Sequence, residues 1–129
     1  EDGGFMLSQD EFLEMLDEIA DEIPREFYHE LNGGILLRPE AKLHPASEPW
    51  RRLWVMGEYR RSPTLGRFIY IYYGSFERLH GDLEKSELRK KVRHTVIHEF
   101  RHHLESLAGE HGLEREDARF LERYRYENI

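Results

Sequence analysis

The sequence predicts an α+β domain that opens with a helix, continues through a small three-stranded sheet and closes with two helices. Three observations carry this prediction. A helix-start signal stands at Ser8, three short β-rich runs follow between residues 35 and 73, and a long helical periodicity begins near residue 86. With 129 residues, the chain is expected to form one domain over residues 1–129, and residues 1–5 are expected to be a tag or processing remnant ahead of Met6.

The first helix is predicted from a capping box between Ser8 and Glu11, in which each side chain can bond the main-chain N–H of the other. Apolar residues then recur at intervals of three and four, as expected for one buried helical face. Pro24 ends this helix or begins the next turn. The buried face is predicted to hold Phe12, Met15, Leu16, Ile19 and Ile23.

Three strands are predicted at Ile35–Arg38, Leu53–Tyr59 and Arg67–Tyr73, because these runs are rich in β-branched, aromatic and aliphatic residues. The segment Pro39–Arg52 contains three prolines and is predicted to be a loop. Residues 60–66 have the Ser, Pro and Gly content of a hairpin connection between the second and third strands.

Residues 86–108 are predicted to form a long amphipathic helix. Gly109 and Gly112 indicate that this helix ends there and that the chain turns into a last helix from Leu113 to Tyr126. The buried face of the long helix is predicted to consist of Leu88, Val92, Val96, Phe100, Leu104 and Leu107.

His98, Glu99 and His102 form the motif HExxH on the long helix. A spacing of four residues places both imidazoles on one helical face, opposite the apolar stripe. Glu99 is rotated from them by about 100° and can reach a metal-bound water without being a ligand. The motif therefore predicts a zinc site with His98 and His102 as ligands and Glu99 as general base.

Two further histidines lie near the motif. His103 projects toward the apolar stripe and is predicted to be a hydrogen-bonded core residue instead of a ligand. His94 and His98 form a second pair four residues apart, which is the weaker metal candidate because it lacks the glutamate that the motif HExxH requires after the first histidine.

Catalytic zinc usually has three protein ligands, so an acidic third ligand is expected after the motif. Asp117 is the first candidate, because it falls inside the apolar stripe of the last helix and a buried carboxylate needs a metal or a basic partner. Glu116 is the second choice, and His111 and Glu114 come third. Glu105 follows His98 by seven residues, about 10 Å along the helix axis, and is expected to be a solvated or outer carboxylate.

Composition limits the alternatives. The net charge of −7 argues against nucleic-acid or membrane partners, despite local pairs such as Arg51-Arg52 and Arg60-Arg61. Without cysteine, any metal must be held by His, Asp or Glu, and a cytoplasmic location is expected. Zinc is the expected metal, although imidazole and carboxylate ligands also suit iron, nickel, copper or manganese.

The run from Val92 to His103, with its doubled histidine, resembles the core of the small zincin-like metallopeptidase family of bacteria. Ile69–Gly74 is similar to the strand that precedes the active-site helix in that family. The resemblance implies a minimal zincin fold and an acidic ligand at Glu116 or Asp117. The sequence departs from the family pattern at Glu105, which stands where the compact form has glycine.

The resemblance implies zinc-dependent hydrolysis of a peptide or protein substrate, with Glu99 as the base. An extended substrate is expected to add to a sheet edge, with Arg67–Tyr73 as the candidate strand because it precedes the active-site helix. The alternative function is a non-catalytic metal-binding or protein-interaction domain of the same fold.

Overall fold

The computed structural model describes residues 6–111, except the side chains of Glu110 and His111. In this part of the chain, helices and strands follow the order expected for an α+β fold. They are α1 (Gln9–Glu22), the 3₁₀ turn η1 (Arg25–Tyr28), β1 (Gly34–Arg38), β2 (Lys42–Leu43), β3 (Trp54–Val55), β4 (Gly57–Ser62), β5 (Gly66–Tyr72), α2 (Tyr73–His80) and α3 (Lys85–His111).

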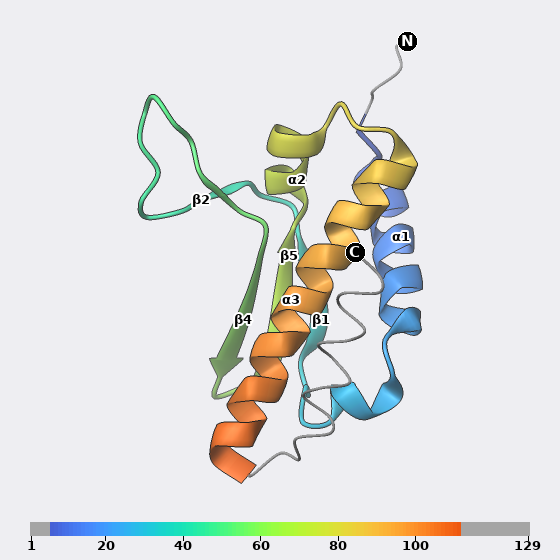
Figure 1. The fold of residues 1–129 in the computed structure, drawn as a ribbon, viewed down its shortest axis with the longest axis vertical. Coiled ribbons are helices and arrows are strands. Elements are labelled where there is room, and N and C mark those ends of the chain that lie inside the picture. Colours follow the sequence, from blue (N-terminus) through green and yellow to red (C-terminus); the bar gives the residue numbers. More distant parts are fainter. Residues whose placement is uncertain (1–5, 112–129) are drawn as a thin grey trace.

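The main sheet has three strands in the order β1-β5-β4 (Figure 1). β5 pairs with β1 in parallel and with β4 antiparallel, so that Ile69 lies between Ile35 and Tyr59. The prediction that Arg67–Tyr73 is an edge strand is therefore wrong. Its Ile- and Tyr-rich composition suits a strand paired on both sides, and β4 takes the edge position instead.

The predicted strand Leu53–Tyr59 is two strands with different partners. Trp54 and Val55 of β3 pair with β2 in a small ribbon that leaves the sheet, whereas Gly57 begins the pairing of β4 with β5. The break falls at Met56, whose carbonyl accepts a hydrogen bond from the N–H of Tyr72. The predicted loop Pro39–Arg52 accordingly contains the short strand β2, which the sequence analysis missed.

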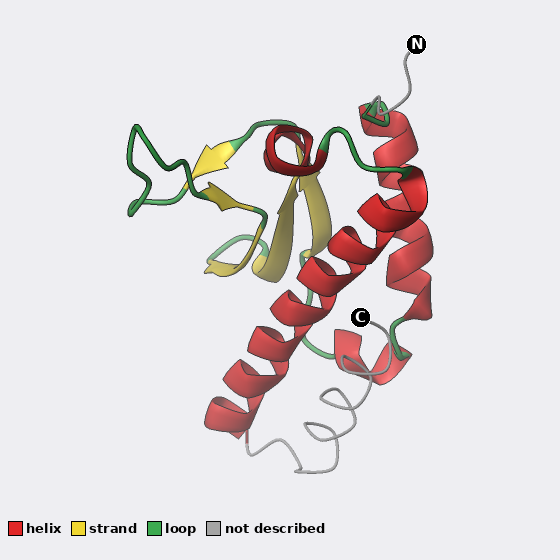
Figure 2. Ribbon diagram, turned by 45° about the horizontal axis from the view of Figure 1, so that its top comes forward, coloured by secondary structure: helices red, strands yellow, loops and turns green. Residues whose placement is uncertain are grey.

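α3 crosses one face of the sheet diagonally, and α1 lies beside it on the side away from β4 (Figures 1 and 2). The predicted apolar stripes of both helices are confirmed, because every residue in them is at least 95% buried. The predicted capping box is also confirmed, since Ser8 and Glu11 bond each other's main-chain N–H groups. The core therefore lies between α1, α3 and the sheet, and it fixes how α3 is rotated about its own axis.

A short helix, α2, was not predicted. The third predicted strand ends at Tyr72, and Tyr73 begins α2, which buries Phe76 completely. Gly74 permits this turn, because a Cβ atom at this position would lie 2.4 Å from the nitrogen of Ala41. The backbone of α2 thus packs directly on the chain that follows β1.

The end of the long helix also differs from the prediction. α3 continues through Gly109 to His111, so Gly109 does not terminate it. A Cβ atom at Gly109 would meet nothing within 4 Å, and the residue is simply an exposed helical glycine. The predicted last helix, residues 113–126, lies outside the described residues. Within residues 6–111, no helix is both long and apolar enough to cross a membrane.

The two glycines predict opposite effects of the same substitution. Gly74→Ala should lower the free energy of unfolding by about 1–3 kcal/mol, because the added methyl group clashes with the backbone at Glu40 and Ala41. Gly109→Ala should raise it by about 0.5–1 kcal/mol, because alanine restricts the unfolded chain and meets no neighbour. Urea denaturation followed by circular dichroism measures both values. Equal effects of the two substitutions would contradict the tight packing of α2.

Candidate functional site

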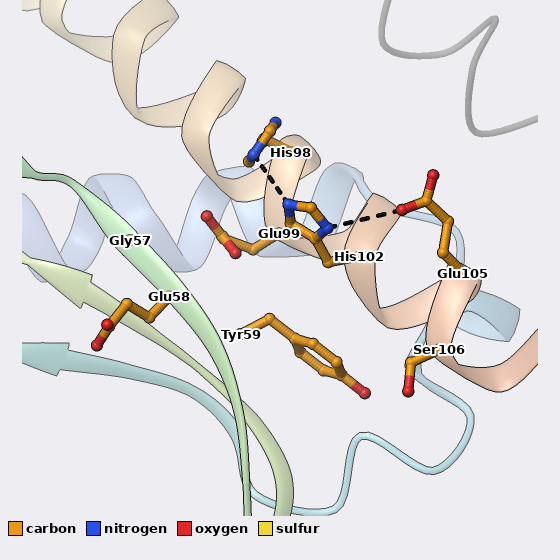
Figure 3. A pocket seen from close by; sticks show the side chains of 8 residues that line it. All are labelled: Gly57, Glu58, Tyr59, His98, Glu99, His102, Glu105 and Ser106. Carbon is orange, nitrogen blue, oxygen red and sulfur yellow. Dashed lines mark hydrogen bonds and ion pairs between the residues drawn. The ribbon is translucent and has the colours of Figure 1, made fainter. Parts of the chain in front are cut away.

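The two histidines of the motif converge on one point beside α3. The Nε2 atoms of His98 and His102 lie 3.1 Å apart, with the ring planes at 89° to each other. Both rings project from the face of α3 opposite the core, as Figure 3 shows. Because the core holds the apolar stripe inward, the rotation of α3 places these imidazoles at the surface.

This separation suits a shared metal ion. Two nitrogens bound to one tetrahedral zinc at about 2.0–2.1 Å lie about 3.3–3.4 Å apart, close to the observed distance between the two Nε2 atoms. Among residues 6–109, whose side chains are described, no group of three His, Asp or Glu side chains is placed to hold a metal ion. The described part of the chain therefore offers two of the ligands that a catalytic zinc requires.

Glu99 lies next to this pair and is almost fully buried, with 6% of its surface exposed. Its carboxylate points toward β4 and not into the core (Figure 3). Burial, together with the negative charge of Glu58, raises the pKa of Glu99 to about 7, while a hydrogen bond from the main-chain N–H of Tyr59 opposes the shift. A carboxyl group with these surroundings can both accept and release a proton near neutral pH.

An open groove runs between α3 and β4, with a volume of ≈ 690 Å³. No described strand pairs with the outer edge of β4. Residues 57, 59 and 61 turn their main-chain groups toward this edge, because the bond from Tyr72 to Met56 fixes the alternation of the antiparallel ladder. The groove is lined by Gly57, Glu58, Tyr59, His98, Glu99, His102, Glu105 and Ser106.

Glu58 belongs to the strand that lines the groove, but its carboxylate points away from the histidine pair and keeps a negative charge (Figure 3). It accepts hydrogen bonds from Lys42 Nζ at 2.8 Å and from the Tyr72 hydroxyl at 2.6 Å. Burial alone would raise the pKa of Glu58, but these two donors and the charge of Arg60 outweigh it and hold the pKa below its usual range. Since its donors keep Glu58 ionised, Glu99 is the carboxyl group of this pair that is suited to carry a proton.

His103 is turned away from His98 and His102 and is completely buried. Its Nε2 bonds the carbonyl of His29 at 2.7 Å, and its Nδ1 bonds the hydroxyl of Tyr59 at 2.8 Å. Burial lowers the pKa of His103, the bond to His29 opposes this, and the charge of Arg67 adds to the lowering. The prediction of a hydrogen-bonded core histidine is confirmed.

The other predicted site residues take separate positions. Glu105 is exposed, with one oxygen 3.3 Å from Arg101 Nε and the other 3.6 Å from His102 Nδ1, in agreement with a solvated or outer carboxylate. His94 lines a different cavity of ≈ 270 Å³ with Glu87, Lys90 and Lys91. The third-ligand candidates Asp117, Glu116 and Glu114, and the side chain of His111, lie outside the described residues.

The contribution of β4 to the site was not predicted. Glu58 and Tyr59 were placed in a strand, but their position opposite the motif depends on which strand forms the sheet edge. The signal in the sequence was the polar composition of residues 57–62, which contrasts with the apolar and aromatic residues 68–73 and favours an edge strand.

Comparisons with known proteins agree with this geometry. The zincin-like metallopeptidase family matches residues 54–122, which include β4, β5 and α3. The chain is also similar to the solved structure of a conserved hypothetical protein from Thermus thermophilus, with 37% sequence identity and a TM-score of 0.68 over 80% of this chain and 99% of that chain. No curated protein matches significantly. From the motif, the fold and the length of both matches, the chain belongs to the zincin-like metallopeptidase family.

Proposed function

We propose that the protein is a zinc-dependent metallopeptidase in which His98 and His102 bind the metal and Glu99 is the general base. The observation that carries the proposal is the convergence of two Nε2 atoms at 3.1 Å beside a buried carboxylate in an open groove. Membership of the zincin-like metallopeptidase family supports the same reaction and the same metal.

A bound zinc ion supplies Lewis-acid chemistry that activates water and polarises a carbonyl group. The chain performs the proton transfers. Glu99 accepts a proton from the water that attacks the scissile carbonyl, as the new C–O bond forms. Glu99 then donates that proton to the leaving nitrogen as the C–N bond breaks. Its position between α3 and β4 restricts the access of bulk water to this proton.

The outer edge of β4 is the proposed binding site for an extended substrate. The main-chain groups of Gly57 and Arg61 face this edge, and they flank Tyr59, whose N–H faces Glu99. A peptide added as a fourth strand would lie in the groove, with its backbone between β4 and the two histidines. Since β5 is paired on both sides, this proposal replaces the expected role of Arg67–Tyr73.

A non-catalytic metal-binding or protein-interaction domain is the second candidate. The wide opening of the groove favours it, together with the presence of only two metal-facing side chains among residues 6–109. The two functions differ in what they require of Glu99. A catalytic base is needed for turnover, whereas a structural metal or a partner groove does not depend on its proton.

Substitutions of the motif separate these functions. Glu99→Gln keeps the shape of the side chain and should lower peptide hydrolysis by about 10²–10⁴-fold while the protein still binds one zinc ion. His102→Ala should release the metal, because one ligand is lost. Elemental analysis of protein purified without chelators gives the metal content, and a fluorogenic peptide library gives the activity. Full activity in Glu99→Gln would overturn the catalytic role of this residue.

The third ligand can be found with the same metal measurement. Asp117→Ala should lose zinc, whereas Glu116→Ala should keep it, because the sequence pattern predicts Asp117 on the inward stripe of a last helix and Glu116 at the edge of that stripe. Both residues lie inside the segment that matches the family. Retention of zinc in Asp117→Ala and its loss in Glu116→Ala would reverse the assignment.

Proline at residue 61 tests substrate binding at β4. Arg61→Pro removes an N–H that faces the outer edge and leaves the ladder to β5 intact. The value of kcat/KM for extended peptides should fall by about two- to tenfold, the effect of one lost hydrogen bond. Arg61→Ala is the control for the lost charge. Equal cleavage by the two folded variants would place the substrate elsewhere.

A further inference from the structure

Tyr59 contacts both the general base and the buried side of α3. Its main-chain N–H lies on the outer edge of β4, the side toward which the carboxylate of Glu99 points (Figure 3). Its ring turns the other way, beneath α3 toward Ser106 (Figure 3). Its hydroxyl then bonds His103 at 2.8 Å. Because Glu99 and His103 are both on α3, the two ends of Tyr59 face the same helix at two separate points.

The direction of each hydrogen bond in this cluster follows from its partners. The carbonyl of His29 can only accept, so Nε2 of His103 carries the proton of the neutral ring. Nδ1 is then an acceptor, and the Tyr59 hydroxyl must donate to it. The phenolic oxygen in turn accepts from Arg67 Nη1 at 3.2 Å. The chain of donors therefore runs from Arg67 through Tyr59 and His103 to the carbonyl of His29.

This direction decides what the phenol of Tyr59 can do. Its only proton is donated to His103, so it has none to offer a developing oxyanion in the groove. The hydroxyl of Tyr59 is also held in a closed environment. Arg67, which is 6% exposed, donates to Ser106 Oγ at 2.7 Å from Nη1, the nitrogen that also bonds Tyr59. The hydroxyl therefore serves to hold strand and helix together.

We propose, on the basis of the peptidase function above, that Tyr59 is a positioning residue whose anchored hydroxyl fixes β4 against α3, so that its own main-chain N–H holds the carboxylate of Glu99. The anchor consists of His103 and Arg67, neither of which lines the groove. Glu99 is thereby oriented from outside its own helix. A general base that must face a metal-bound water gains most from such a fixed orientation.

Tyr59→Phe tests the proposal, because it removes the anchor and keeps the ring and the main-chain N–H. Tyr73→Phe is the matched control: Tyr73 is buried, Tyr59 is partly buried, and the hydroxyl of Tyr73 bonds the carbonyl of Leu7, away from the groove. NMR measures the amide proton of residue 59, which should lie downfield in the wild type while it donates to a carboxylate. Glu99→Gln makes this acceptor neutral and should move the amide proton of residue 59 upfield. The size of that change shows how much of the chemical shift comes from the carboxylate.

In Tyr59→Phe, the amide proton of residue 59 should shift upfield in both zinc-free and zinc-loaded protein, with zinc stoichiometry unchanged. The value of kcat should fall about ten- to a hundredfold at a temperature far below unfolding. Tyr73→Phe should change neither quantity. An unshifted amide in Tyr59→Phe, or equal shifts in the two variants, would overturn the proposal. If the wild type cleaves no peptide, the proposed function fails, and the amide still decides whether the anchor exists.

A second pair of variants protects the test against misfolding of Tyr59→Phe. His103→Leu removes the acceptor for the Tyr59 hydroxyl, whereas His103→Asn can place its Oδ1 near the position of Nδ1 and so restore it. The amide of residue 59 should shift upfield in His103→Leu and return toward its wild-type position in His103→Asn. The same shift in both variants would show that the hydroxyl anchor does not control Glu99.

Discussion

The burial of one face of α3 is the constraint on which the rest of the structure depends. Val96 and Phe100 are fully buried against the sheet and α1, and they leave the helix only one rotation about its axis. That rotation sends His98 and His102 to the surface and Glu99 to the boundary. The same helix is thus both the largest part of the core and the carrier of the candidate metal ligands, so the packing of the core aligns the site.

Glu58 on β4 and Glu99 on α3 differ in protonation because their surroundings differ. Glu58 has Lys42, Arg60 and Tyr72 around it and remains charged. Burial raises the pKa of Glu99, and the charge of Glu58 further favours its protonated form. Two neighbouring carboxyl groups whose pKa values are shifted in opposite directions are a common arrangement at sites of proton transfer.

Local features of the fold were readable from the sequence, and nonlocal ones were not. The capping box at Ser8, the stripes of α1 and α3 and the burial of His103 each depend on residues within a turn or two along the chain. The order β1-β5-β4 depends on a crossover between Arg38 and Gly66, and no periodicity within a strand encodes it. The placement of Tyr59 opposite the motif follows from that order, which is why half of the groove could not be predicted.

The hydrogen bonds that build the groove also join distant parts of the chain. The turn between β4 and β5 closes over three residues, from Ser62 to Gly66, whereas Tyr59 bonds His103 across 44 positions and His103 bonds His29 across 74. Short-range hairpins form readily, and long loops close at an entropic cost that rises with length. The hairpin is therefore expected to form early and the groove late. Separation of α3 from β4 would then dismantle the groove as a local opening event, with the β4–β5 hairpin still paired.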